Sequence, residues 1–128
     1  MQNIIREGKV TATYPERCSC RVQFEDLENL VSAELPIIQP CAGGNKFYSL
    51  PDVGESVLCL FSENSDGECG FVIGSRYHEH ETPKVNSQDK NRIDFEDGTF
   101  IEYDRKSHEL VIHCVGNLKI TAKRVDIN

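Results

Sequence analysis

The sequence predicts an all-β protein, and three observations support this fold class. Apolar residues gather in short runs rich in β-branched and aromatic side chains, and they do not recur at helical spacing. Pro and Gly separate these runs, as they commonly separate strands. The C-terminal third alternates apolar with charged residues, which is the period of a sheet with one buried face. At 128 residues, the chain is long enough for one ordinary domain, or for a small domain with an appendage that depends on partners.

Residues 1–77 are predicted to form one domain of five strands. A loop at residues 39–55 holds two Pro and three Gly, too many for a regular element. Asp66-Gly67 is a turn signal between the last two strands. Five short strands with one long loop fit a small barrel such as the OB-fold, and a β-sandwich is the alternative. The predicted strands are Lys9 to Tyr14, Cys18 to Phe24, Val31 to Leu35, Ser56 to Phe61 and Cys69 to Ser75.

A polar linker is predicted at residues 78–91, where Val85 is the single aliphatic residue. Residues 92–128 then alternate apolar and charged side chains, with turns at Asp97-Gly98 and Gly116-Asn117. Because alternate side chains of a strand lie on one face, each predicted strand of this segment has one apolar face. The residues predicted to share the apolar faces are Ile93, Phe95, Ile101, Tyr103, Leu110, Ile112, Cys114, Leu118, Ile120, Ala122, Val125 and Ile127.

These apolar faces need a second layer, because a one-faced meander of short strands is marginal in water. The barrel could supply that layer. Identical chains could instead pack their apolar faces around a threefold axis, which would also pair the strand edges. The polar linker favours the second arrangement, so we expect a homotrimer whose core is formed by the residues named above.

The charge balance argues against a nucleic-acid ligand. The chain has 14 Lys and Arg against 21 Asp and Glu, a net charge of -7, which repels phosphate backbones. An OB-fold binding module for an oligomeric ligand or a nucleic acid is therefore the weaker functional alternative. The start of the chain, Met1 to Gly8, lacks the basic residues and apolar run of a signal peptide, so we expect synthesis and folding in the cytoplasm.

The six cysteines show no CxxC spacing, which argues against a zinc site or a redox motif. Cys41 falls in the predicted loop, and the others fall in strand-like runs where a thiol packs as a small apolar group. We expect reduced and mostly buried cysteines.

The sequence contains no convincing catalytic site, so we expect no enzymatic activity and no cofactor. The alternating histidines His78 and His80 are a weak candidate for a metal site, because no third ligand lies nearby and the segment reads as a solvated linker. A carboxylate-rich set in the C-terminal third is interpreted as exposed strand positions rather than as an acid-base pair. The members of that set are Asp94, Glu96, Asp97, Glu102 and Asp104.

Several motifs resemble the phage baseplate assembly protein V family, which is related to the type VI secretion spike proteins called VgrG. The most specific block is residues 50–57, LPDVGESV. Further matching blocks are residues 21–24, 42–43 and 70–75 in the first half and residues 93–99 and 102–104 in the second. Their order along the chain is the family's order. The residues that carry the motifs are Leu50, Pro51, Val53, Gly54, Val57, Gly70, Gly74, Asp97 and Gly98.

The resemblance implies an N-terminal OB-fold and a C-terminal intertwined triple-stranded β-helix, both trimeric. It further implies a structural central spike at the end of a contractile tail tube, bound to tube and baseplate hub proteins and driven through the target envelope. Such a protein would be assembled in the cytoplasm and become part of a phage tail or an extracellular injection particle.

Two departures from the family are informative. Only 18 residues separate Gly74 from Ile93, too few for the hydrolase domain that some spikes carry there. The sequence stops at Asn128 without the His-x-His apex motif that binds iron in related spikes. We therefore expect a separate PAAR-like tip protein to cover the end of the β-helix; a truncated sequence is the alternative.

Overall fold

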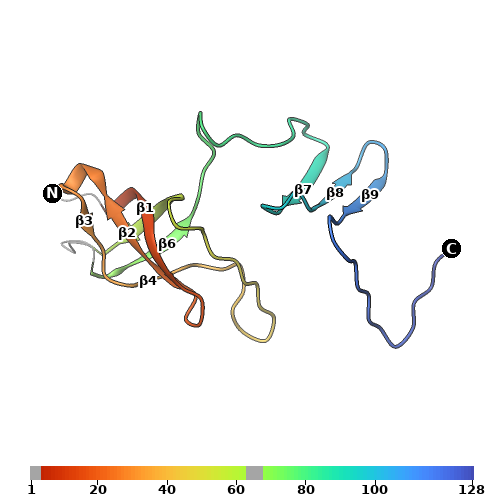
Figure 1. The fold of residues 1–128 in the computed structure, drawn as a ribbon, viewed down its shortest axis with the longest axis horizontal. Helices are drawn as coiled ribbons and strands as arrows, with labels where there is room; N and C mark the ends of the chain where they lie inside the picture. Colours follow the sequence, from red (N-terminus) through yellow and green to blue (C-terminus); the bar gives the residue numbers. More distant parts are fainter. Residues whose placement is uncertain (1–3, 63–67) are drawn as a thin grey trace. The chain divides into compact units, whose positions relative to one another are not determined.

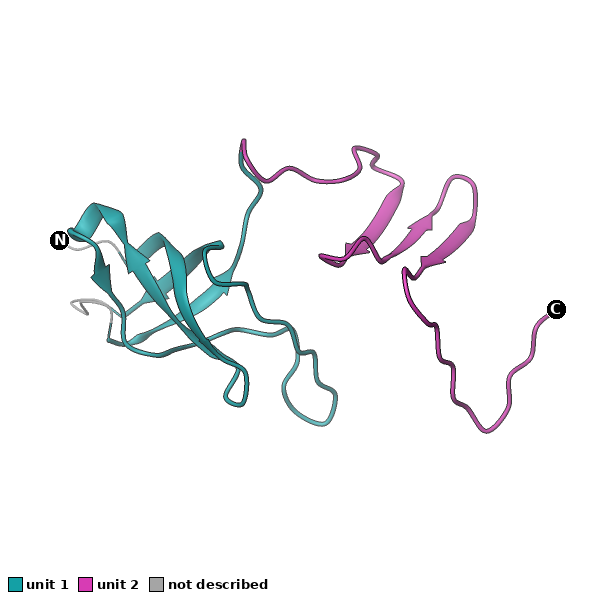
Figure 2. Cartoon of the chain, viewed as in Figure 1, with its two compact units in different colours: residues 1–78 teal, residues 79–128 magenta. Residues whose placement is uncertain are grey.

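A computed structural model describes residues 4–62 and 68–128. The chain divides into two compact units, residues 1–78 and residues 79–128 (Figure 2). The turn predicted at Asp66-Gly67 lies outside the described residues. Within the described ranges, no helix has the length and apolar character needed to cross a membrane.

The strands of the first unit belong to a single sheet in the order β3-β2-β1-β5-β6, with β4 also pairing with β2 (Figure 1). Every pairing of these strands is antiparallel. The bounds are β1 (Ile5–Tyr14), β2 (Ser19–Phe24), β3 (Leu30–Val31), β4 (Leu35–Pro36), β5 (Ser56–Phe61) and β6 (Gly70–Gly74), with a short 3-10 helix at Glu25–Leu27.

The sheet closes on itself just after β4. Ile37 forms a parallel bridge with Val72 of β6, and the N–H of Ile38 donates to the carbonyl of Val72 at 2.9 Å. Closure satisfies backbone groups that an open sheet would leave exposed. The first unit is therefore a barrel, and the β-sandwich alternative is wrong.

The barrel interior is filled by the inward side chains of all its longer strands. Phe24 and Phe61 meet edge to face, with ring centroids 5.6 Å apart and an interplanar angle of 74°. Gly8 lies among them, because a Cβ there would stand 2.6 Å from the Val22 side chain and 2.8 Å from Phe24. The buried apolar residues are Val10, Cys20, Val22, Phe24, Leu35, Val57, Cys59, Phe61 and Val72.

The expectation that most cysteines are buried is wrong. Cys20 and Cys59 are buried in the core, whereas Cys41 and Cys69 are exposed. The reason is that Cys69 lies just before β6 and Cys41 lies in the long loop, so neither has an inward strand position.

The second unit contains a three-stranded antiparallel meander in the order β7-β8-β9. Its strands are β7 (Lys90–Asp94), β8 (Phe100–Asp104) and β9 (Glu109–His113). The polar linker was predicted to extend to residue 91, but Lys90 and Asn91 already pair with Asp104 and Tyr103. Polar residues at these positions are compatible with pairing because one face of the sheet carries charged side chains.

The alternation after the predicted turn at Gly116-Asn117 indicated a further strand with Leu118, Ile120 and Ala122 on one face, but residues 114–128 form no strand in the single chain (Figure 1). The N–H of Val115 donates to the hydroxyl of Thr99 at 3.3 Å. Thr99 directly precedes β8, and Phe100 pairs with His113, so Val115 still lies beside β8 at the point where the strand pairing ends. A single chain therefore forms a meander with an unpaired tail, and no β-helix.

Candidate functional site

One face of the β7-β8-β9 meander is apolar and uncovered. Ile93, Ile101 and Ile112 stand opposite one another on the three strands, and Tyr103 stands opposite Leu110. Directly paired residues share a face of a sheet, so these five side chains form one surface, called here the apolar sheet face. Each is between 38% and 60% exposed. Exposed apolar patches of this kind mark interaction sites.

The opposite face of the meander is polar and internally paired. The guanidinium of Arg92 lies 3.0 Å from Glu102 and 2.9 Å from Asp94. It also lies 3.8 Å from the ring centroid of Phe100, which stacks on His113. The hydrogen bond to Glu102 is the main cause that raises the pKa of Arg92. The centre of the polar face is thus paired within the chain, while the apolar sheet face is uncovered.

Glu102 was predicted to be an exposed strand position, and this is wrong. Its exposure is 9%, and its second oxygen lies 3.6 Å from the ammonium of Lys90. The long side chains of Arg92 and Lys90 cover it from the neighbouring strand. The sequence shows the three charges but not the register that brings them together.

The other predicted carboxylates have structural roles at turns or in ion pairs. Asp97 accepts the N–H of Thr99 at 2.9 Å, a bond that lowers the pKa of Asp97, and Gly98 beside it has a φ of 96°. Asp104 accepts the N–H of Lys106 at 2.9 Å, which lowers its pKa likewise. Such caps hold the two turns that set the register of the meander.

The remaining residues predicted for a trimer core lie outside the strands β7, β8 and β9. Phe95 follows β7 and is 51% exposed. The others lie beyond β9, where the chain has no strand, and their convergence in an assembly stays a prediction. They are Cys114, Leu118, Ile120, Ala122, Val125 and Ile127.

The LPDVGESV motif forms the turn that leads into β5. Gly54 has a φ of 92°, a conformation that favours glycine, and its N–H donates to the carbonyl of Val10 at 2.8 Å. The N–H of Val10 in turn donates to the carbonyl of Glu55 at 3.0 Å. The Glu55 carboxylate accepts the Ser75 hydroxyl at 2.6 Å and the N–H of Asp52 at 3.2 Å. The motif therefore ties β1 to the end of β6.

The other motif residues of the barrel are also structural. Val57 is buried, Leu50 and Pro51 are half-buried, and Val53 is exposed at the turn. Gly70 allows close packing, because a Cβ there would stand 2.4 Å from the ring of Phe61. The last of these residues, Gly74, ends β6 opposite Leu58, where the pairing shifts register.

Phe71 lies within the predicted strand Cys69 to Ser75, and its side chain is 47% exposed. The run from Cys69 to Ser75 is apolar at consecutive positions, so its sequence does not show which side faces inward. The inward side is that of Val72.

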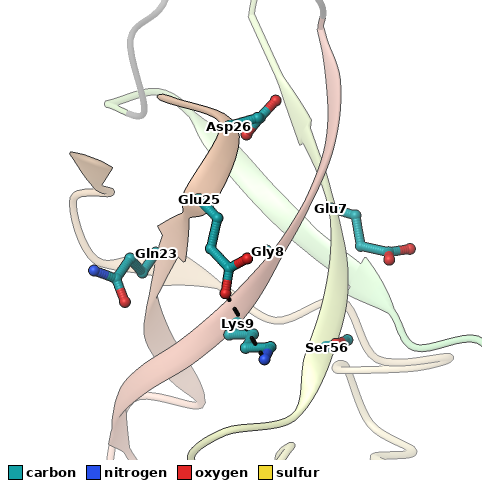
Figure 3. A pocket seen from close by; sticks show the side chains of 7 residues that line it. All are labelled: Glu7, Gly8, Lys9, Gln23, Glu25, Asp26 and Ser56. Carbon is teal, nitrogen blue, oxygen red and sulfur yellow. Dashed lines mark ion pairs between the residues drawn. The ribbon is translucent and has the colours of Figure 1, made fainter. Parts of the chain in front are cut away.

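A hollow of about 230 Å³ lies on the outside of the barrel, over β1, β2 and β5 (Figure 3). Its labelled side chains point in different directions rather than toward a common centre. Glu25 pairs with Lys9 at 3.8 Å, and Glu7 turns away to pair with Arg76 at 2.6 Å. The arrangement offers no convergent set of groups for a substrate.

The metal candidates are placed in the polar segment before the meander. His80 lies 3.2 Å from Glu79, and its side chain is 82% exposed. His78 belongs to the same segment. Across residues 4–62 and 68–128, no three or more His, Cys, Asp or Glu side chains gather in a group that could hold a metal ion.

The barrel and its motif turn define a class of injector protein. Residues 6–77 match the type VI secretion system/phage-baseplate injector OB domain. The match covers more than half of the chain, which therefore belongs to this family, and the barrel is its OB domain. The family resemblance inferred from the sequence motifs is confirmed.

A curated relative extends the comparison beyond the barrel. The chain is similar to the spike protein of Escherichia phage P2, with 29% identity over 123 residues. The alignment covers 95% of this chain and 56% of the relative, so the chain spans little more than half of the relative's length. The first match shows the family of the barrel, and the second is a similarity to a spike protein that also extends over the second unit.

Proposed function

We propose that the chain is a subunit of a homotrimeric central spike. The OB domain forms the base, and residues 92–128 of three copies form an intertwined triple-stranded β-helix. The observation that carries this proposal is the apolar sheet face, which is uncovered in one chain, whereas the opposite face is polar and holds ion pairs within the chain. Three copies that turn this face toward a common axis bury it, at about 25 cal/mol per Å² of apolar surface removed from water.

The proposed role is mechanical and not enzymatic. Interchain backbone hydrogen bonds and a shared apolar core must fail together before such a prism bends, which suits it to piercing an envelope. The force is supplied by the contractile tail and not by this chain. Support for a non-catalytic role comes from the carboxylates, which are used in turn caps and ion pairs.

The proposed partners follow from a place at the tail tip. The OB domain contacts tail tube or baseplate hub proteins, and a PAAR-like tip protein covers the far end of the β-helix. The spike is assembled in the cytoplasm and then becomes part of the tail or injection particle.

The test is the mass of the full chain in solution, by light scattering after gel filtration. We expect three times the 14.5 kDa chain mass, and a band of that size that persists in SDS without heating. Ile112→Asp should give monomers with an intact barrel, because three charges would meet in one apolar core.

His113→Asp is the matched control, since it adds the same charge one residue away on the opposite face. We expect this variant to stay trimeric. A monomeric wild-type chain would overturn the proposed function, and a trimeric Ile112→Asp variant would overturn the assignment of the inward face.

A further inference from the structure

The chain leaves the barrel after β6, and the next two residues are tied back to the barrel surface. The Ser75 hydroxyl donates to the Glu55 carboxylate at 2.6 Å. The guanidinium of Arg76 donates from Nε and Nη2 to the two carboxylate oxygens of Glu7, at 2.6 Å and 3.2 Å. A forked pair is the geometry in which an exposed ion pair does contribute to stability. These four residues are called here the exit clamp.

One contact of the exit clamp spans a whole strand. Glu7 of β1 stands opposite Leu58 of β5, and Leu58 stands opposite Gly74 of β6. The side chain of Arg76 therefore crosses β5 on the outside of the barrel to reach β1. Figure 3 shows the Glu7 carboxylate directed away from the hollow.

The other contact leads to the same strand. The carbonyl of Glu55 accepts the N–H of Val10 in β1 at 3.0 Å, and its carboxylate also accepts the N–H of Asp52 at 3.2 Å. Ser75 is thus joined to β1 through one intermediate residue, and Arg76 is joined to β1 directly. Both contacts of the exit clamp end on β1.

The sheet holds β1 more firmly than β6. β1 is paired along both sides, with β2 and with β5. β6 is paired with β5, and on its other side Val72 is bridged by Ile37. Force that pulls on the last residue of β6 breaks its ladder with β5 one bond after another, whereas force shared with β1 must break the bonds of several strands together.

We propose that the exit clamp transmits force between the polar linker and β1, so that β6 is not peeled from the barrel when the spike is driven into an envelope. The inference rests on the proposed mechanical role of the chain. It goes beyond that role because it names the residues through which load enters the barrel.

Trypsin tests whether the exit clamp is closed in solution. Arg76 and Lys84 are both cleavage sites after β6, and an arginine held in an ion pair must be released before it is cut. We expect Glu7→Gln in the full chain to raise the rate of cleavage after Arg76 by about fivefold relative to cleavage after Lys84. Glu28→Gln neutralises an exposed carboxylate elsewhere on the barrel and should leave the ratio unchanged. A ratio that Glu7→Gln does not alter would overturn the inference.

Single-molecule pulling tests whether the exit clamp carries load. The full chain is held by handles at its two ends, and the lifetime of the folded barrel is measured at constant force. Ser75→Ala with Arg76→Gln removes both contacts from the linker side and should make unfolding about fivefold faster. Lys84→Gln removes one positive charge from the polar linker outside the exit clamp and should leave the lifetime unchanged.

The unfolding rate in urea separates load transmission from ordinary stabilisation. No force passes through the polar linker in urea, so the double variant should there unfold less than about twofold faster than the wild type. Equal acceleration in both experiments, or an unaltered lifetime under force, would overturn the inference. Pulling uses single chains and does not depend on assembly, whereas light scattering decides the spike proposal, so the two failures are distinguished.

Discussion

The carboxylate of Glu102 and the guanidinium of Arg92 lie 3.0 Å apart on neighbouring strands, directly behind the apolar sheet face. Their side chains are only 11% and 17% exposed. The pair joins β7 to β8, and Lys90 adds a second cation to the same carboxylate at 3.6 Å. The polar face thus fixes the register that aligns the isoleucines on the other side.

Removing the charge of Glu102 should therefore loosen the meander. We expect Glu102→Gln to lower the thermal unfolding midpoint of the full chain, because two cations on one face lose their shared partner. Glu96→Gln is the control, since Glu96 is exposed and makes no ion pair within the described part of the chain. Circular dichroism on heating gives the midpoints, and equal midpoints for the two variants would contradict the role given to Glu102.

Gly8 should be intolerant of any side chain. An added Cβ would stand 2.6 Å from both the Gln23 carbonyl oxygen and the Val22 side chain, and the backbone of β2 cannot move without breaking its pairing with β1. We expect Gly8→Ala to lower the free energy of unfolding by about 1–3 kcal/mol.

Urea unfolding at pH 7 measures this loss. Gly44→Ala is the matched control, because nothing lies within 4 Å of a Cβ added at Gly44. An unfolding free energy for Gly8→Ala equal to that of the control would show that the core has more room than the packing around Phe24 indicates.

The features predicted correctly from sequence are those determined by local patterns. Breakers and β-branched runs located the longer strands of the barrel, and alternation placed Ile93, Ile101 and Ile112 on one face of the meander. The LPDVGESV block indicated the family by its resemblance, and the structure shows that it combines a positive-φ glycine, Gly54, with a carboxylate, Glu55, that ties two distant segments.

The errors arose where the outcome depends on contacts between distant residues. The tail pattern predicts a further strand, but residues 114–128 form none in a single chain, because alternation alone does not supply a pairing partner. Burial of Glu102 depends on strand register, which the sequence does not specify. Phe71 lies in a run that is apolar at consecutive positions, so the sequence does not show which side of the strand faces inward. Closure of the barrel at Val72 determines that side.

Glu34 should make the stability of the barrel depend on pH. Its carboxylate accepts the Ser19 hydroxyl at 2.5 Å and the Arg17 guanidinium at 2.6 Å, and these bonds lower the pKa of Glu34 from 4.5. A carboxylate with a lowered pKa in the folded state stabilises above its unfolded pKa, and the contribution is lost as pH falls through the folded value.

We therefore expect the barrel to lose stability below about pH 4.5, and Glu34→Gln to remove part of that loss. Urea midpoints at pH 7 and pH 3 measure it. Glu28→Gln serves as control, because Glu28 makes no ion pair within residues 4–62 and 68–128. The assignment fails if the two variants change the pH dependence equally.

Cysteine reactivity should report on the closure of the barrel. Burial raises the pKa of the Cys20 thiol to about 11 and that of Cys59 to about 12, so at pH 8 neither has an appreciable thiolate fraction or solvent access. Cys41, in the long loop, is exposed to solvent. We expect iodoacetamide to label Cys41 within minutes and to label Cys20 and Cys59 only when urea unfolds the barrel, as followed by peptide mass spectrometry. Rapid labelling of Cys59 in the native protein would mean that β5 and β6 separate readily, and the OB domain could not then serve as a rigid base for a spike.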